Sequence, residues 1–333
     1  MKIHKQWIEE WLSIFGIHGN ISDILEFLHK DEEIDGERQI RIITAVETEE
    51  EVVVFKLVHE TMFAPELIEA QIEFSQKLRK CGINTTYQYK AEKGYVQEVI
   101  LEEMRFSLTC EAFIGSEPEM LTEELQYELG KALGRMHLIS ETQQMEIGFS
   151  RVYHEVMNKS SYRKIWGNQY PDWVDKEWID RITEKHDYLM GEIQSKWTEL
   201  PKAAVQGDVF GLNNVAVTET GIAIYDYNLA SDEVLVGDFL LAWYRTIGDQ
   251  SMHCFLNESN AELMWKAYAA GYLESRPLSE LEYNIGYKLC AVLGVLHLSK
   301  LAIELKGDGR EDYAKQCLQA AERIMDRPRW IRN

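Results

Sequence analysis

Three polar residues in the second half of the chain have the types and the order that phosphoryl transfer requires. Asp208 and Asn213 lie five residues apart in VQGDVFGLNNVAV (205–217), and Asp226 follows at the end of the strand-like run IAIYD. A carboxylate can accept the proton of an attacking hydroxyl, while an amide and a second carboxylate can hold the Mg²⁺ that bridges nucleotide phosphates. We therefore take Asp208 as a candidate catalytic base and Asn213 and Asp226 as candidate metal ligands.

The neighbouring sequence helps to distinguish a catalytic loop from an ordinary polar turn. Gly-Asp and Asn-Asn are common turn dipeptides, so each part alone is also explained by a polar turn. The spacing of Asp208 and Asn213 nevertheless equals that of the protein-kinase catalytic loop, and short strands flank it on both sides. A hairpin after Asn213 would return Asp226 to the same edge. Gln206 stands where that loop usually has a histidine.

The first half of the chain contains a lysine that could bind a phosphate. Lys56 lies in the middle of VVVFKLV (52–58), an apolar run in which an ammonium group is unfavourable without an anionic partner. A nucleotide phosphate and a carboxylate from the following helix, residues 65–80, would supply that partner. Glu69 and Glu73 share one face of this helix, and we favour Glu69. The alternative is an edge strand that points Lys56 into water.

The elements that must position these residues fall into two groups. The N-terminal part alternates short helices with strand-like runs, and the C-terminal part is mostly helical with one β-hairpin. We expect helices at 5–15, 21–29 and 65–80 and strands at 38–46, 52–58, 95–101 and 106–115. Helices then follow at 122–140, 173–198, 236–247, 260–274, 279–304 and 311–326, with short strands at 203–205, 214–217 and 222–227. This pattern predicts an α+β protein with a β-rich lobe of residues 1–112 and a helical lobe of residues 113–333.

Composition narrows the classes of partner. A net charge of −21 disfavours nucleic acid, because such binding needs Lys and Arg to neutralise phosphates. It favours a cationic small molecule or a metal-bridged anion, although an acidic surface also simply keeps a protein in solution. The five cysteines are scattered and never form a CxxC pair, which argues against disulfides and a zinc site. No apolar run reaches membrane-spanning length and no signal peptide is evident, so we expect no membrane partner and a cytoplasmic location.

Several short sequence motifs together resemble those of the aminoglycoside phosphotransferase and choline kinase family, and the resemblance extends over about residues 35–305. That family usually has H-G-D-x-x-x-x-N in the catalytic loop and an aromatic and a polar residue after the metal aspartate. The matching phrases here are Gln206-Gly207-Asp208 with Asn213, Asp226-Tyr227-Asn228, LGRMH (133–137), Gly237-Asp238 and CEAFIG (110–115).

The resemblance implies a bilobal, protein-kinase-like fold and a role for each matched residue. Asp208 would be the catalytic base, Asn213 and Asp226 would bind Mg²⁺, and Lys56 with Glu69 would position the phosphates of ATP. Cys110 and Ala112 would lie at the adenine-binding hinge, and Gly237-Asp238 would brace the catalytic loop. The expected reaction is ATP- and Mg²⁺-dependent phosphorylation of a hydroxyl on a small molecule: an aminoglycoside, a choline-like amine, a sugar or an amino alcohol.

Two other interpretations remain open. Gln206 keeps a hydrogen-bond donor and acceptor but lacks the ring of the usual histidine, which suits a catalytically weak kinase-fold protein with a binding or structural role. An α-helical binding protein with a chance motif is the third interpretation, and it predicts that Lys56 and Asp226 lie far apart. The aromatic-rich segment 161–179 would line a substrate pocket or serve as a helix-packing seam.

Overall fold

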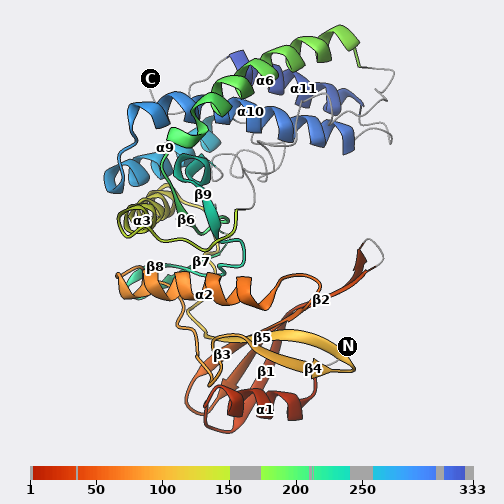
Figure 1. Ribbon diagram of the computed structural model, residues 1–333, viewed down its shortest axis with the longest axis vertical. Helices are drawn as coiled ribbons and strands as arrows, with labels where there is room; N and C mark the ends of the chain where they lie inside the picture. Colours follow the sequence, from red (N-terminus) through yellow and green to blue (C-terminus); the bar gives the residue numbers. More distant parts are fainter. Residues whose placement is uncertain are drawn as a thin grey trace. The chain divides into compact units, whose positions relative to one another are not determined.

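The chain divides into two compact units. The structure is a computed structural model that describes residues 3–34, 37–150, 174–209, 212, 214–240, 258–304 and 311–326 (Figure 1). Unit 1 comprises Met1–Pro118 and Asn214–Ala230, and unit 2 comprises Glu119–Asn213 and Ser231–Asn333. The hairpin that we assigned to the helical lobe is therefore part of unit 1, so the division does not follow a single cut at residue 112.

Unit 1 is built on a five-stranded antiparallel sheet. Its strand order is β1-β2-β3-β5-β4, which places β3 at the centre. The strands are β1 (Ile21–Ile34), β2 (Glu37–Thr48), β3 (Val52–His59), β4 (Gln97–Leu101) and β5 (Met104–Ala112). The strands expected at 38–46, 52–58, 95–101 and 106–115 are confirmed. A two-stranded sheet of β7 (Val215–Thr218) and β8 (Gly221–Ile224) completes the unit.

The two faces of the large sheet have different chemistry, because successive side chains of a strand point to opposite sides. Helix α1 (Lys5–Ile14) covers one face, where Trp11 packs edge-on against Phe55 with ring centroids 5.5 Å apart. Helix α2 (Pro65–Lys80) lies over the other face (Figure 1). Arg41, Lys56 and Glu111 lie on this second face, so the sheet itself brings three charged residues to one side.

Residues 21–29 form a strand and not the expected helix. Ile21, Ile24, Leu25 and Leu28 have helical spacing, but the segment pairs with β2 along its length. A register shift between Glu26 and Leu28 interrupts the alternation that would have indicated a strand. The tertiary pairing of an edge strand therefore overrides a helix-like local pattern.

Helix α2 forms where the sequence predicts it. Pro65 occupies its first turn, where a missing N–H costs nothing, and Lys77, Arg79 and Lys80 lie in its last turn. Gly82 follows with φ +84°, a left-handed conformation that ends the helix with little strain.

Unit 2 is mostly helical. Its described helices are α3 (Glu123–Thr142), α6 (Lys176–Lys196), α9 (Glu258–Ser275), α10 (Glu280–Glu304) and α11 (Glu311–Asp326). Thr122 caps α3, since its hydroxyl accepts the Leu125 N–H at 3.1 Å. Strand β6 (Lys202–Val205) pairs with β9 (Ser231–Val234), a strand that the sequence did not indicate.

Two predicted segments of unit 2 fall partly outside the described residues. Residues 151–173 cover most of the aromatic-rich segment, and 241–257 cover the end of the helix expected at 236–247. Within the ranges that are described, no helix combines the length and the apolar character needed to cross a membrane.

Glycines allow α3 and α9 to approach closely. A Cβ at Gly130 would overlap Tyr268 O, and a Cβ at Gly271 would overlap Tyr127 O, in each case a backbone atom of the other helix. These positions therefore need glycine because of the close approach of two backbones.

Candidate active site

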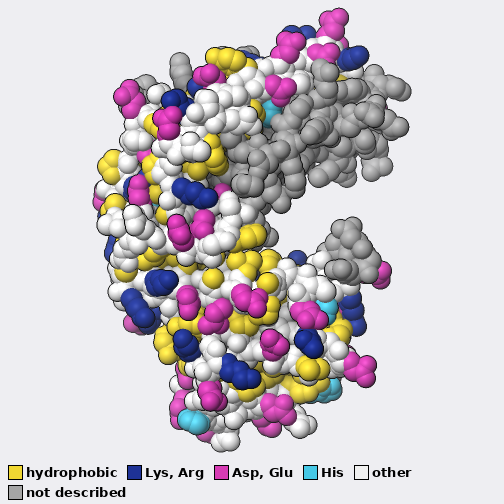
Figure 2. Space-filling model, viewed as in Figure 1, with side chains coloured by type: hydrophobic (Ala, Val, Ile, Leu, Met, Phe, Trp, Pro, Cys, Tyr) yellow, Lys and Arg dark blue, Asp and Glu magenta, His cyan; other side chains and the backbone are white. Residues whose placement is uncertain are grey.

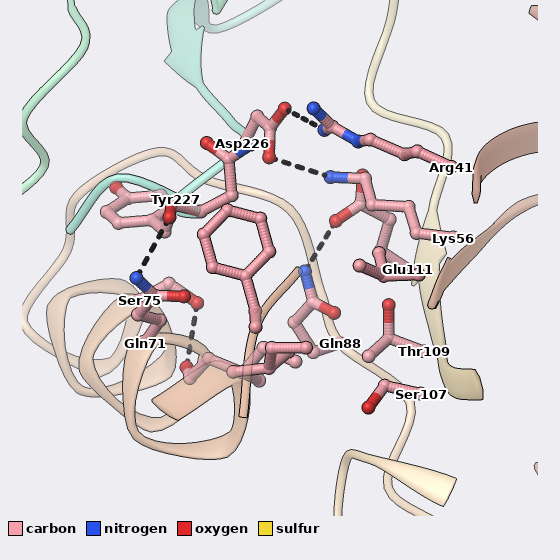
Figure 3. A pocket seen from close by; sticks show the side chains of 15 residues that line it. Arg41, Lys56, Gln71, Ser75, Gln88, Ser107, Thr109, Glu111, Asp226 and Tyr227 are labelled. Carbon is pink, nitrogen blue, oxygen red and sulfur yellow. Dashed lines mark hydrogen bonds and ion pairs between the residues drawn. The ribbon is translucent and has the colours of Figure 1, made fainter. Parts of the chain in front are cut away.

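Lys56 lies near the centre of unit 1 and is paired with two carboxylates. Its Nζ lies 2.9 Å from Glu111 Oε1 and 3.3 Å from Asp226 Oδ1 (Figure 3). β3 is flanked by β2 and β5, so the alternative of an edge lysine that points to water is wrong. The interpretation of a chance motif, which placed Lys56 and Asp226 far apart, is also wrong.

A second cation reaches the same aspartate. Arg41, on β2, places Nη2 at 3.1 Å from Asp226 Oδ2. The two oxygens of Asp226 are therefore bound by different cations from neighbouring strands (Figure 3). Sequence reasoning missed Arg41, although its place in QIRI (39–42), where polar and apolar residues alternate, marks it as lying opposite the apolar core.

The charges of this cluster stabilise one another. Burial alone would raise the pKa of Asp226, but Lys56 and Arg41 outweigh it and hold that pKa below its ordinary value. Burial alone would lower the pKa of Lys56, but Asp226 and Glu111 outweigh it and raise that pKa. Both groups are therefore charged at neutral pH.

The backbone around Asp226 is fixed on both sides. Before it, the Tyr225 N–H donates to Asn214 O at 3.0 Å. After it, Gln71 of α2 donates from Nε2 to Asn228 O at 2.9 Å and to Ala230 O at 3.0 Å. Asp226 itself has φ +55°, a conformation that non-glycine residues adopt rarely and that is often found at functional sites.

A small cavity adjoins the cluster between α2 and the sheet. Its volume is about 60 Å³, which leaves room for water beside the charged groups. Ser107 Oγ lines it, and this buried oxygen has no hydrogen-bond partner among the described residues. The cavity extends the polar site inward, toward Ser75 and Gln88 (Figure 3).

The described contacts do not pair Lys56 with Glu69, and a role for Glu69 at the nucleotide stays a prediction. Glu69 accepts hydrogen bonds from the backbone N–H groups of Tyr95 at 3.0 Å and Val96 at 2.7 Å. It therefore anchors the segment before β4. The carboxylate beside Lys56 is instead Glu111, and its signal lies in β5, where Ser107, Thr109 and Glu111 alternate with Phe106, Leu108 and Cys110.

The backbone groups of the predicted adenine-binding residues already have partners in the segment between α2 and β4. Cys110 is buried in the core on the α1 face, and its carbonyl accepts the Tyr89 N–H at 2.9 Å. The Ala112 N–H donates to Tyr87 O at 2.8 Å. Roles for Cys110 and Ala112 in adenine binding stay predictions, and they would have to use other atoms than these two.

An exposed apolar surface lies near this end of the sheet. Leu25 pairs with Ala45, Ala45 pairs with Val54, and Val54 pairs with Glu111, so all four lie on the face that carries Lys56. Leu25 is 51% exposed and Phe27 is 54% exposed. The ring of Phe27 contacts that of Phe113, with centroids 6.4 Å apart. Such a surface suits a flat aromatic group.

The candidate catalytic loop lies in unit 2. Gln206 is fully buried, and its Oε1 accepts the backbone N–H of Asp208 at 2.6 Å. Glutamine at this position therefore supports the loop through its amide oxygen. Asp208 follows Gly207, whose φ is +84°, and its side chain is half-buried. Asn213 lies outside the described residues, so its role as a metal ligand stays a prediction.

The LGRMH motif (133–137) and the Gly237-Asp238 motif are in contact within unit 2. His137 of α3 is buried, with Nε2 at 2.9 Å from Asp238 Oδ2 and Nδ1 at 2.8 Å from the Tyr272 hydroxyl. The described contact of Asp238 is thus with α3, and a bracing role toward the catalytic loop stays a prediction.

The residues of unit 1 fit a metal-bound nucleotide. Carboxylate oxygens such as those of Asp226 are the ligands that Mg²⁺ prefers, and it commonly takes its remaining ligands from phosphates and water. Lys56 and Arg41 are of the two residue types that form strong charge-assisted hydrogen bonds with phosphate oxygens. Across the described residues, no group of three or more His, Cys, Asp and Glu side chains is arranged to hold a metal ion.

Comparison with known proteins shows a fold similar to that of several small-molecule kinases. No protein-family model matches the chain, and no curated protein matches its sequence. Among solved structures, it is similar to the amicoumacin kinase hAmiN in complex with AMP-PNP, Ca²⁺ and Ami, with 13% identity over 97% of this chain and 94% of that one and a TM-score of 0.63. It is also similar to a microcompartment-associated aminopropanol kinase, with 16% identity, coverage of 97% and 95% and a TM-score of 0.62.

A third similar structure is the choline kinase LicA from Streptococcus pneumoniae, with 13% identity, coverage of 96% and 98% and a TM-score of 0.51. Each match spans nearly the whole of both chains. The expected protein-kinase-like fold is confirmed, and so is the resemblance to small-molecule kinases at the level of the fold. Identities this low show the fold alone and leave substrate and activity to be proposed.

Proposed function

We propose that this protein is an ATP- and Mg²⁺-dependent kinase that phosphorylates a hydroxyl group of a small molecule. The observation that carries the proposal is the convergence of Lys56 and Arg41 on the two oxygens of Asp226. Three charged groups from three parts of unit 1 are held in one place, with a combination of charges that suits a metal ion and a phosphate chain. The match to kinases over 97% of the chain supports the same function.

For the nucleotide, we propose that Lys56 and Arg41 bind phosphate oxygens. Asp226, together with Asn213, would hold Mg²⁺, which neutralises charge on the phosphates when bound. The exposed surface of Leu25, Phe27 and Phe113 would bind the adenine ring by apolar contact. On nucleotide binding, Lys56 and Arg41 would exchange Asp226 for phosphate oxygens, which would leave the Asp226 carboxylate available as a metal ligand.

For the acceptor, we propose that Asp208 accepts the proton of the attacking hydroxyl at a carboxylate oxygen. The hydrogen bond from its own N–H to Gln206 fixes the loop and therefore the direction of that side chain. Catalysis would come from positioning and from charge stabilisation rather than from covalent chemistry.

We propose that the acceptor carries an amine as well as a hydroxyl. A net charge of −21 attracts cations over a distance, which favours an aminoglycoside, a choline-like amine or an amino alcohol over a neutral sugar. Two of the similar structures are, by name, an aminopropanol kinase and a choline kinase.

The test is a thermal-shift measurement with Mg·ATP at constant ionic strength. We expect a rise in melting temperature for the wild type and its loss in Asp226→Asn, which keeps the side-chain shape but removes the charge. A screen of ATP consumption across aminoglycosides, amino alcohols and sugars would then identify the acceptor class. No melting shift in the wild type and no acceptor-dependent ATP consumption would refute the proposal.

A weakly catalytic kinase-fold protein is the second candidate. The observation that favours it is Gln206, which stands where the resemblance has a histidine and supports the loop through one amide oxygen that accepts the Asp208 N–H at 2.6 Å. Binding of Mg·ATP without acceptor-dependent turnover would support this candidate against the first.

A further inference from the structure

We infer that Glu111, on β5, is the residue that positions Lys56 for the nucleotide phosphates, in place of a carboxylate from α2. This inference rests on the proposed function for the identity of the ligand. Glu111 lies within CEAFIG (110–115), for which the resemblance implies adenine binding, and the inference gives this strand residue the role toward Lys56 that the sequence analysis assigns to Glu69.

Glu111 is held from both ends of its carboxylate. Its Oε1 lies 2.9 Å from Lys56 Nζ, and its Oε2 accepts a hydrogen bond from Gln88 Nε2 at 2.6 Å (Figure 3). Glu111 is only 6% exposed, so little water competes for these contacts. A buried carboxylate with a cation on one oxygen and an amide on the other has a single favourable orientation.

Gln88 is itself fixed. Its Nε2 also lies 3.2 Å from Thr86 Oγ1, and its backbone N–H donates to Gln76 Oε1 at 3.4 Å. The order of contacts therefore runs from Gln76 on α2 through Gln88 and Glu111 to Lys56. Each contact limits the movement of the next side chain.

Helix α2 does not supply this carboxylate. Glu69 is engaged with the backbone of Tyr95 and Val96, and the residue of α2 that reaches toward Asp226 is the neutral Gln71, which binds Asn228 O and Ala230 O. The helix thus fixes the backbone near Asp226, while Glu111 fixes the lysine.

The consequence is that strand pairing sets the geometry of Lys56. Lys56 pairs with Thr109, and Val54 pairs with Glu111, so lysine and glutamate are diagonal neighbours on adjacent strands. A lysine held by a helix would be released if the helix moved. A lysine paired with a residue of its own sheet would keep that contact while it exchanges Asp226 for a phosphate.

Glu111→Gln distinguishes the loss of a group that orients Lys56 from the loss of a negative charge, because these two changes should have opposite effects on the affinity for Mg·ATP. Removing a negative charge near phosphates would strengthen nucleotide binding if charge were all that mattered. Losing the group that orients Lys56 would weaken it. We expect the dissociation constant for Mg·ATP to rise about tenfold in Glu111→Gln, the size of effect typical for one charge-assisted contact.

The matched comparison is Glu69→Gln, which removes the same charge from α2. We expect it to change the dissociation constant for Mg·ATP by less than about twofold, because Glu69 does not contact Lys56. Gln88→Leu changes no charge and should weaken Mg·ATP binding in the same direction as Glu111→Gln. Calorimetric titration measures all three, and melting temperatures without ligand show whether each variant folds. Tighter binding in Glu111→Gln, or a larger loss in Glu69→Gln, would overturn the inference.

A second readout needs no nucleotide. In protein labelled with ¹³C-lysine, the Cε signal of Lys56 is assigned by its loss in Lys56→Arg. We expect it to shift in Glu111→Gln and to stay in place in Glu69→Gln. An unchanged signal in Glu111→Gln refutes the positioning role whatever the protein binds. A shifted signal in a protein that binds no Mg·ATP refutes the proposed function and the phosphate part of the inference, while Glu111 still orients Lys56.

Discussion

Asp226 binds a different cation with each of its carboxylate oxygens, and this sharing sets the roles of both cations. Lys56 has a second carboxylate partner, Glu111, which would still balance its charge if Asp226 bound a metal ion. Arg41 has Asp226 as its described ion-pair partner, so it is the cation that metal binding would release. At the scale of single residues, Arg41 is therefore the side chain on which phosphate affinity should depend most directly.

Arg41→Gln tests this dependence. We expect the KM for ATP to rise about tenfold with a smaller change in kcat, because a charged contact to the nucleotide is lost before the chemical step. Steady-state kinetics with the identified acceptor measures both constants. Arg38→Gln is the matched control on the same strand, since Arg38 pairs with Asp31 away from the cluster and should leave both constants unchanged. Equal effects of the two substitutions would contradict the role of Arg41.

Gln206 is the residue at which this chain departs from the resemblance. We expect Gln206→Leu to lower kcat about tenfold or more, because Asp208 N–H loses its acceptor and the loop loses its fixed geometry. The KM for ATP should change little, since the phosphate contacts that we propose, Lys56 and Arg41, lie in unit 1. Gln206→His measures how far glutamine limits the rate: a rise in kcat would show that the amide supports the loop less well than the ring. An unchanged kcat in Gln206→Leu would contradict a supporting role.

At the scale of elements, the crossing of α3 and α9 depends on the absence of side chains. Gly130 and Gly271 each face a backbone carbonyl of the other helix, so a methyl group can be placed only by moving the helices apart. The same crossing carries the hydrogen bond between His137 and Tyr272. A shift of either helix would therefore disturb polar contacts as well as packing.

Gly130→Ala is expected to lower the free energy of unfolding by about 2 kcal/mol or more, because overpacking outweighs the better helix propensity of alanine. Gly191→Ala is the matched control in α6, where an added Cβ would meet nothing within 4 Å. It should raise the free energy of unfolding by up to about 1 kcal/mol. Denaturant titration of both variants checks the pair, and a stabilising effect of Gly130→Ala would show that the helices do not pack as described.

The elements also show which parts of the structure could be predicted from the sequence. Helix α2 and Lys56 were found because their signals are local: a proline, a basic last turn and one charge in an apolar strand. Strand β1 was missed because its hydrophobic spacing is helical and only pairing with β2 makes it a strand. Glu111 was missed because its role depends on which residue of a neighbouring strand lies beside it. The pairing of strands is a tertiary property, and it decided both outcomes.

At the scale of the whole molecule, the excess of negative charge lowers the stability of the folded state. The chain has 56 acidic and 35 basic residues, and on the face shown in Figure 2 acidic side chains are interspersed with Lys and Arg rather than gathered in one patch. Long-range repulsion among these charges opposes compactness, while close ion pairs such as that of Lys56 and Glu111 are partly shielded from salt by burial.

We therefore expect NaCl to raise the melting temperature by a few degrees between about 20 and about 200 mM, because screening weakens the net repulsion more than the buried pairs. Thermal scans with a non-ionic osmolyte at equal osmolality serve as the control. A melting temperature that falls with salt would mean that attractive pairs dominate. The same scans define the baseline for Mg·ATP, whose own ionic strength would otherwise imitate binding.

Unit 1 is made from two separated stretches of chain, with residues 119–213 between them. On the ribosome, the sheet with Lys56, Arg41 and Glu111 is complete about a hundred residues before Asp226 is synthesised. During that interval Lys56 already has Glu111 as a counter-ion, whereas Arg41 waits for a carboxylate that arrives only after the first half of unit 2 has emerged. Asp226 is therefore the last member of the charged cluster to be synthesised, and a chain interrupted before it would contain the residues of the five-stranded sheet but lack the proposed metal ligand Asp226.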